Sequence, residues 1–364
     1  MSDGLVPGFA TAAGTTAYAR RFPNIAPGHF RSALNGLTLS SVGLGTGGFT
    51  RRPRPESSVA YSRYRETVRL AVESGINVID TAINYGAELA ERIVGHALHD
   101  AFLDDAISRD QVVVATKGGY LPFPVEQYRE RFSEAAEPVA GHHSVEPVFL
   151  RHQVEQSRRN LGLSVIDIYF IHNPEEQWVH VGPQTAIARL RRAFEALEEL
   201  VELGWLRSYG VATAEGFRIP GPSFHPLEDV VALAHEVAGD AHHLAAIEVP
   251  FSLAMPEALT NRAHHLGGGP LSLLEAARVC GLCVLTSASI HRGRIPFEIP
   301  EALRSLDTTL ATDVQYALQF ARSVPGVVTA LVGMSQPRHV EENAASWRHE
   351  PLDLLEDSAP VSAT

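Results

Sequence analysis

Residues 59–81 read VAYSRYRETVRLAVESGINVIDT and contain the unit that decides the fold. Apolar residues recur at helical spacing up to Ser74, Gly75 follows, and residues 76–81 form a short apolar run rich in β-branched side chains. A glycine that ends a helix just before a strand is typical of the connections in repeated β/α proteins. This stretch therefore predicts a surface helix that leads into a buried strand.

The same unit recurs along the chain. Helical patterns at 89–101, 147–161 and 186–203 separate further apolar runs. Eight such units, spaced by about 35 to 55 residues, predict an α/β fold with a single (β/α)8 TIM barrel over residues 31–350, rather than a doubly wound sheet with a second domain. The eight predicted strands are residues 41–46, 76–81, 112–117, 166–172, 206–212, 244–250, 282–287 and 327–332.

The two ends of the chain and three long segments lack the alternation of helical patterns and apolar runs. Residues 1–30 have no periodicity and predict a flexible N-terminal arm, and residues 351–364 predict a C-terminal tail. Long segments at 120–146, 250–270 and 289–307 each follow a predicted strand. Barrel enzymes build their active sites from such segments, so we expect these three at the active face.

The composition limits the class of partner. The chain has 30 basic and 42 acidic residues, which gives a formal net charge of −12 and disfavours nucleic acid or an anionic membrane as a partner. No run approaches the roughly 20 apolar residues that span a bilayer, and the first thirty residues lack a signal-peptide pattern. We therefore expect a cytoplasmic protein that acts on a small molecule, with its oligomeric state left open.

Three motifs suggest other chemistries but lack the required context. Residues 43–48, GLGTGG, fit the dinucleotide motif G-x-G-x-x-G, but Pro53 and Pro55 follow where that motif needs a helix, so we interpret the glycines as a close-approach loop at the barrel mouth. Cys280 and Cys283 lie at the end of a helical pattern and in an apolar run, which predicts two small core side chains. The 17 histidines contain no H-x-H pair, and we predict no metal site.

Polar residues at the ends of predicted strands two, three and four indicate the chemistry. Asp80 and Tyr85 follow the second strand, Lys117 ends the third, and His172 ends the fourth. A tyrosine hydroxyl, with a usual pKa near ~10, becomes a usable proton donor and acceptor when an ammonium group favours its phenolate. We expect Lys117 to supply that charge, Asp80 to hold Lys117, His172 to orient a carbonyl, and Tyr85 to deliver a proton as hydride arrives at carbon.

These motifs resemble those of the aldo-keto reductase family over nearly all of residues 34–348. The similarity lies in D-T-A-x-x-Y-G at 80–86, A-T-K at 115–117 and His172-x-Pro174, together with GLGT at 43–46 and a closing signature between 325 and 343. The sequence His172-Asn173-Pro174-Glu175 and the long segment 120–146 resemble a less-studied bacterial branch. The resemblance implies a nicotinamide cofactor that lies across the barrel mouth without a Rossmann unit.

The resemblance also implies where the cofactor binds. Its phosphates and adenosine would meet the start of the last helix, where free N–H groups favour phosphate, and NADP(H) is favoured over NAD(H) because basic side chains lie nearby. The basic candidates for a 2′-phosphate are Arg338 and His339, with Arg292 and Arg294 as further options. The cofactor-binding residues implied are Gly45, Thr46, Thr213, Glu248, Ser287, Ala288, Ser289, Gly333, Ser335, Arg338, His339, Glu342 and Asn343.

Three positions depart from the family pattern on the nicotinamide side. Ala212-Thr213 stands where relatives have Ser-Asn, Glu248 where they have Gln, and Ser287 where they have an aromatic ring. A carboxylate beside the ring would favour the oxidised, cationic form of the cofactor. In the alternative interpretation, Glu248 points into the barrel or pairs with a buried base.

Two other functions stay open beside carbonyl reduction or alcohol oxidation. The chain could be a non-catalytic nicotinamide-binding subunit that reports redox state to a partner. It could also be a redox-neutral isomerase or lyase that uses the Tyr85–Lys117 pair. The loops that would shape the substrate pocket have the least pattern, so the sequence names no substrate.

Overall fold

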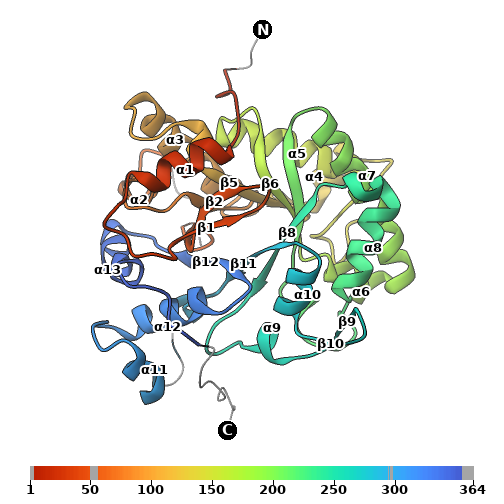
Figure 1. Cartoon of the computed structure of the whole chain (residues 1–364). Coiled ribbons are helices and arrows are strands. Elements are labelled where there is room, and N and C mark those ends of the chain that lie inside the picture. The colour runs from red at the N-terminus through yellow and green to blue at the C-terminus, as the bar shows by residue number, and fades with distance from the viewer. Residues whose placement is uncertain (1–3, 50–55, 294, 296–297, 355–364) are drawn as a thin grey trace.

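The computed structural model describes residues 4–49, 56–293, 295 and 298–354 (Figure 1). Eight strands close into one barrel in which every neighbouring pair is parallel. In barrel order, these strands are β3 (Val42–Gly45), β4 (Val78–Asp80), β5 (Val113–Gly118), β6 (Ile166–His172), β7 (Leu206–Ala212), β8 (Leu244–Pro250), β11 (Cys283–Ser287) and β12 (Val327–Gly333). The predicted TIM barrel is confirmed, and each strand lies within two residues of its predicted bounds.

Helices cover the outside of the barrel (Figure 1). Neighbouring helices in the ring pack against one another, and those predicted from periodicity begin and end within a few residues of the predicted positions. Gly162 follows one of them with a φ of 66°, which is the left-handed conformation that ends a helix. The main helices are α2 (Val59–Glu73), α3 (Leu89–Leu103), α5 (Pro147–Leu161), α7 (Pro183–Glu202), α8 (Leu227–Ala238), α10 (Leu273–Val279), α12 (Asp313–Ser323) and α13 (Pro337–Trp347).

The barrel interior is filled by side chains and is closed at one end. Residues such as Ile168, Phe170 and Leu285 point inward from the strands and pack in one cluster. Ala10 and Leu39 belong to the same cluster although they precede the barrel strands in the sequence. The hairpin of β1 (Phe30–Ala33) and β2 (Leu37–Ser40) therefore helps to seal the amino ends of the strands.

The predicted flexible N-terminal arm is wrong for the described residues of that segment. Thr11 accepts a hydrogen bond from Gly14 N and begins α1 (Ala12–Arg20), which packs beside the start of the barrel (Figure 1). Tyr18 in this helix is fully buried, and its hydroxyl lies 2.6 Å from the carbonyl oxygen of Val72 and 3.0 Å from that of Ile76. Few large apolar residues occur in α1, so its periodicity is too weak to reveal a helix.

The C-terminal tail and the two cysteines are described in part. Leu352 is buried and its backbone N–H donates to Ser323 Oγ, whereas residues 355–364 of the predicted tail lie outside the described residues. Both cysteines are free thiols; Cys283 lies buried in β11, as predicted, whereas Cys280, the residue that follows α10, is only partly buried against the core. Burial raises the pKa of Cys283 to about 12.

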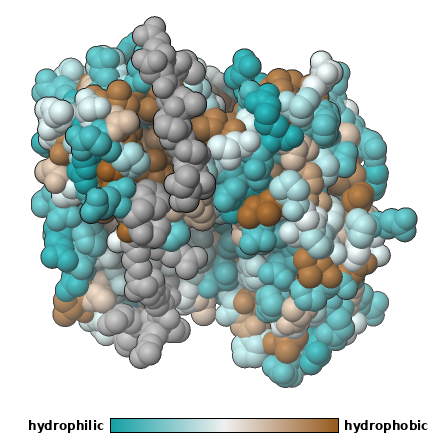
Figure 2. Space-filling model, turned by 90° about the horizontal axis from the view of Figure 1, so that it is seen from below, coloured by the Kyte–Doolittle hydropathy of each residue, from teal (hydrophilic) through white to brown (hydrophobic). Residues whose placement is uncertain are grey.

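Segments that follow the strands build one side of the molecule. Two of them, α9 (Glu257–Thr260) after β8 and α11 (Glu301–Leu306) after β11, lie on the lower side of Figure 1. Seen from that side, hydrophilic and hydrophobic residues are intermixed over the coloured surface (Figure 2). No helix of the described residues has the length and hydrophobicity needed to cross a membrane.

Candidate active site

The structure brings together the four residues predicted to carry the chemistry. Asp80 ends β4, Lys117 lies in β5, His172 ends β6, and Tyr85 lies between β4 and α3. Their side chains meet because the carboxyl ends of parallel strands share one end of the barrel. Lys117 Nζ contacts Asp80 Oδ1 and lies 5.7 Å from the centroid of the Tyr85 ring. The rings of Tyr85 and His172 meet edge to face, with centroids 6.2 Å apart.

A turn of irregular backbone presents Tyr85 to this site. The N–H of Tyr85 donates to Ala82 O at 3.0 Å, and Ala87 and Glu88 adopt positive φ angles before α3 begins. A Cβ atom added to Gly47 would lie 3.4 Å from the Tyr85 ring. This is an ordinary van der Waals distance, so the contact does not itself require a glycine. Within residues 43–48, the predicted close approach lies at Gly43 in β3, where a Cβ atom would lie 2.7 Å from Leu331 Cδ2.

Lys117 lies between two carboxylates. Besides Asp80, its Nζ lies 3.0 Å from Glu248 Oε2, as an ion pair without the alignment of a hydrogen bond, and it donates to Thr81 O at 3.1 Å. Burial acts to lower the pKa of Lys117, but the two carboxylates outweigh it and the net pKa is raised. Glu248 thus pairs with a buried base, as in the alternative interpretation, and its contact with a nicotinamide ring stays a prediction.

His172 is held as a neutral imidazole. Burial, followed by the charge of Lys117, lowers the pKa of His172 well below its usual value. The ring of Tyr120 packs edge to face on His172, with centroids 5.0 Å apart. The Nδ1 atom of His172 is buried without a hydrogen-bond partner among the described residues. A neutral ring with an unused polar atom suits a hydrogen bond to a bound molecule.

Two residues of the long segment 120–146 support His172 and were missed at the sequence level. His143 Nε2 donates to the carbonyl oxygen of His172 at 2.8 Å, and its Nδ1 accepts from Gln177 Nε2 at 2.8 Å. The Tyr120 hydroxyl donates to Glu176 Oε1 at 2.9 Å and accepts from Asn173 at 3.1 Å. The only sequence signal for Tyr120 is its place three residues after Lys117, and nothing in the spacing indicates His143.

Among the predicted cofactor residues near the barrel strands, some hydroxyl groups already have a hydrogen-bond partner and one does not. The Thr46 hydroxyl is buried and donates to Asp80 O at 3.0 Å, and Ser289 Oγ donates to Thr286 O at 3.2 Å. The hydroxyl of Thr213 is buried without a partner among the described residues. The others of this group, Gly45, Ser287 and Ala288, lie at the ends of β3 and β11.

The remaining predicted cofactor residues gather where β12 meets α13. Gly45 and Gly333 are paired across β3 and β12, which places the start of α13 at the same end of the barrel as Asp80. No side chain caps α13; Pro337 has no N–H and that of His339 donates to Gln336 O at 2.9 Å, so the N–H of Arg338 is the one in this turn that could meet a phosphate. Ser335, Arg338, His339 and Glu342 are at least partly exposed there, whereas Asn343 is buried. Arg294 and the side chain of Arg292 lie outside the described residues.

Unpartnered buried atoms show that this end of the barrel fits a polar ligand. Buried polar atoms in folded proteins almost always have a hydrogen-bond partner. Among the described residues, the side-chain atoms that lack one at or after the ends of β4, β6, β7 and β8 include Thr81 Oγ1, Asn84 Oδ1, His172 Nδ1, Thr213 Oγ1 and Ser252 Oγ. A nicotinamide amide and a substrate oxygen could meet such atoms.

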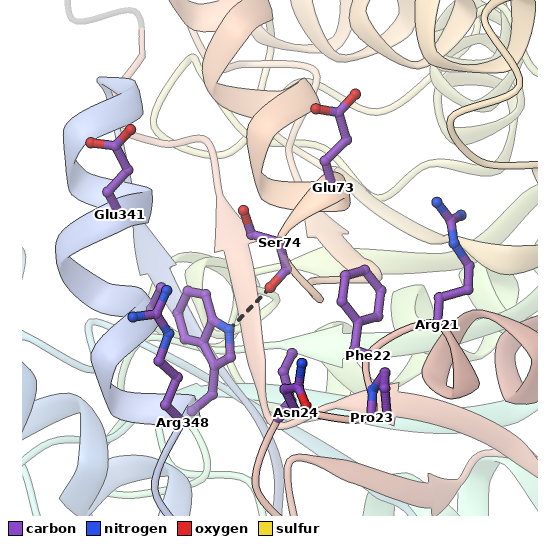
Figure 3. Close-up of a pocket in the computed structure, with 11 residues that line it drawn as sticks. Arg21, Phe22, Pro23, Asn24, Glu73, Ser74, Glu341 and Arg348 are labelled. Atoms are coloured by element: carbon purple, nitrogen blue, oxygen red, sulfur yellow. Dashed lines mark hydrogen bonds between the residues drawn. The ribbon is translucent and has the colours of Figure 1, made fainter.

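A separate cavity of about 340 Å3 lies away from this site. It is bounded by the residues after α1 and by the ends of α2 and α13, and Trp347 Nε1 donates to Ser74 O across it at 3.1 Å (Figure 3). Ser74 precedes the amino end of β4, whereas Asp80 is the residue at its carboxyl end. The cavity is therefore at the opposite end of the barrel from Tyr85.

Comparisons with known proteins show which family and which solved structures this chain is similar to. A family model described as the aldo/keto reductase family matches residues 41–219. A protein of Escherichia coli (strain K12) named NADH-specific methylglyoxal reductase is 31% identical over 183 residues, which cover 50% of this chain and 51% of that protein. The chain thus spans about half the length of this relative. An uncharacterized oxidoreductase of Mycobacterium bovis is 28% identical over 359 residues, covering 89% of this chain and 92% of that protein.

The solved structures extend the comparison to the fold. An aldo/keto reductase from Klebsiella pneumoniae in complex with NADP and acetate has a TM-score of 0.61 at 21% identity, covering 88% of this chain and 90% of that chain. This likeness shows that the two chains share the barrel fold. The family model over residues 41–219 and the sequence relatives show that this chain is similar to proteins of the aldo-keto reductase family.

Proposed function

We propose that this protein is an NAD(P)H-dependent reductase that interconverts an aldehyde or ketone and the corresponding alcohol. The observation that carries the proposal is the convergence of Tyr85, Lys117 and His172 at the carboxyl end of the barrel. The match of the aldo/keto reductase family model to residues 41–219 supports it, because that segment contains Asp80, Tyr85, Lys117 and His172. A bound nicotinamide supplies or accepts the hydride, and the residues of this chain orient the carbonyl and move the proton.

Each residue has a role that follows from its environment. Tyr85 gives its phenolic proton to the carbonyl oxygen in reduction and takes it back in oxidation. Lys117 lies near the Tyr85 ring and favours the phenolate, while Asp80 holds the ammonium group in place. Neutral His172 can donate a hydrogen bond to the carbonyl oxygen without adding charge. The geometry serves both directions of the reaction.

The cofactor site is proposed on the same grounds. Thr213 Oγ1 and Ser252 Oγ would bind the nicotinamide amide, and the start of α13 would bind the phosphates. We favour NADP(H) because exposed Arg338 lies in the first turn of α13, within reach of a 2′-phosphate. The Klebsiella pneumoniae structure contains NADP, whereas the Escherichia coli relative is named as NADH-specific. The choice between the two nicotinamides therefore needs a direct test.

The test follows the absorbance of the reduced nicotinamide with a panel of aldehydes and ketones that includes methylglyoxal. We expect oxidation of NADPH that depends on the carbonyl substrate. Arg338→Ala should raise the KM for NADPH by about tenfold and leave that for NADH unchanged, because only NADPH carries the 2′-phosphate. Equal effects on both nicotinamides would contradict the preference.

Two other results would contradict the proposed reaction itself. Cofactor binding without turnover of any carbonyl or alcohol would indicate a non-catalytic nicotinamide-binding subunit. Conversion of a substrate without any change in nicotinamide absorbance would indicate a redox-neutral isomerase or lyase. Product analysis beside the absorbance measurement distinguishes these two results.

A further inference from the structure

Lys117 joins two carboxylates that come from opposite walls of the barrel. In the ring of eight strands, β4 with Asp80 and β8 with Glu248 are four places apart, so they face each other across the interior. Lys117 reaches from β5 into the space between them and contacts both. The three side chains are almost completely buried, with exposed fractions of 1% for Lys117, 5% for Asp80 and 7% for Glu248.

The charges in this cluster do not balance when all three groups are ionised. Two carboxylates and one ammonium leave a net charge of −1 in a buried site, which is strongly unfavourable. Among the described residues, Lys117 is the one cation that contacts either carboxylate. The other titratable groups that face the cluster are Tyr85 and His172, and His172 is neutral. The neighbouring ends of β3, β7 and β11 contribute the uncharged residues Gly45, Thr46, Ala212, Leu285 and Ser287.

We propose that Asp80 and Glu248 share one proton, so that the pair carries the single negative charge that balances Lys117. Two carboxyl groups that contact the same ammonium group in a buried site repel each other when both are ionised, and one proton held between them removes that repulsion. In agreement, the pKa of Asp80 is raised well above its usual value, first by burial and then by the charge of Glu248, against the opposing effect of Lys117.

The shared proton gives Glu248 a positioning role that acts through Lys117. While the proton is bound, the cluster is neutral and Lys117 can favour the Tyr85 phenolate. Once the proton leaves at higher pH, the cluster gains a negative charge, which favours the protonated phenol that reduction requires. This kinetic consequence depends on the proposed function, whereas the shared proton itself does not.

Infrared spectroscopy tests the shared proton directly. A protonated carboxyl group has a C=O stretching band that is separate from the carboxylate bands and shifts on exchange into D2O. We expect wild-type protein near neutral pH to show one protonated carboxyl group more than Glu248→Gln. Asp80→Asn should remove the same band, because Glu248 then pairs with Lys117 alone. Equal numbers of protonated carboxyl groups in wild type and both variants would overturn the proposal.

A second buried carboxyl group requires a control. Burial raises the pKa of Glu91 to about 7, so this residue can contribute its own band near neutral pH. The comparison is therefore made in a Glu91→Gln background, in which the band from the pair should persist and should vanish as pH rises. A band that is already absent in Glu91→Gln would belong to Glu91 and would contradict the shared proton.

The kinetic part is tested by the pH profile of carbonyl reduction. In Glu248→Gln, the Asp80–Lys117 pair stays neutral at high pH, so the basic limb should move to lower pH by about one unit. If the basic limb of the Glu248→Gln profile does not move, Glu248 does not influence the protonation of Tyr85. Absence of turnover in wild type would contradict the proposed function alone, because the infrared result requires neither cofactor nor substrate.

Discussion

At the scale of single residues, the hydroxyl of Tyr85 is the group proposed to transfer the proton, whereas its ring makes the packing contacts. The ring of Tyr85 contacts His172 and lies near Lys117 and Gly47, and these contacts involve carbon atoms that phenylalanine also has. Tyr85→Phe therefore keeps the shape of the site and removes the proton donor. A change of this kind distinguishes a catalytic group from a residue that only fills space.

We expect Tyr85→Phe to lower kcat by at least about 100-fold while the Kd for the nicotinamide changes by no more than a few-fold. Steady-state kinetics beside a fluorescence titration of the cofactor would measure both quantities. The matched control is Tyr209→Phe, which removes a buried hydroxyl that donates to Glu198 Oε1 in the barrel wall. The control should retain its turnover. Wild-type kcat in Tyr85→Phe would exclude this tyrosine as the proton donor.

At the scale of elements, the sequence predicts the strands, the helices and the end of the barrel at which residues meet, but not each side-chain contact between distant segments. The eight strands and the helices around them follow from apolar runs, helical spacing and glycine stops, all of which are local signals. The meeting of Asp80, Lys117 and His172 also follows, because parallel strands place their carboxyl ends together. The pairing of Glu248 with a buried base is only one of two alternatives at the sequence level, because the strand order does not show how far the Lys117 side chain reaches across the barrel.

The helix α1 shows the same limit, since its stability comes from tertiary contacts. We expect Tyr18→Phe to reduce the free energy of unfolding by about 1–2 kcal/mol, because the buried carbonyl oxygens of Val72 and Ile76 lose the Tyr18 hydroxyl. Urea unfolding measures this change, and kcat should be unaffected because α1 lies at the amino ends of the strands. A variant as stable as wild type would show that α1 does not anchor residues 4–30.

At the scale of the whole molecule, a buried histidine and a buried glutamate make the free energy of unfolding change with pH in opposite directions. Burial lowers the pKa of His143 to about 4, so the folded protein keeps this ring neutral while the unfolded chain protonates near pH 6.5. Burial raises the pKa of Glu91 to about 7, so the folded protein keeps this carboxyl group protonated while the unfolded chain ionises near pH 4.5. His143 therefore destabilises the fold as pH falls below 6.5, and Glu91 destabilises it as pH rises above 4.5.

Because the two groups act in opposite directions, the difference in unfolding free energy between wild type and variant should change with pH in opposite directions for the two variants. Urea unfolding between pH 4.5 and 7 measures these differences. Relative to His143→Gln, wild type should lose about 1.4 kcal/mol of unfolding free energy for each unit that pH falls below 6.5, because only the unfolded wild-type chain gains the proton. Relative to Glu91→Gln, wild type should lose a similar amount for each unit that pH rises, up to about pH 7. Subtracting the unfolding free energy of the variant from that of wild type removes the contribution of every titratable group that both proteins contain. Parallel pH dependences for wild type and a variant would show that the replaced group titrates alike in the folded and unfolded chains, and that its burial does not control its charge.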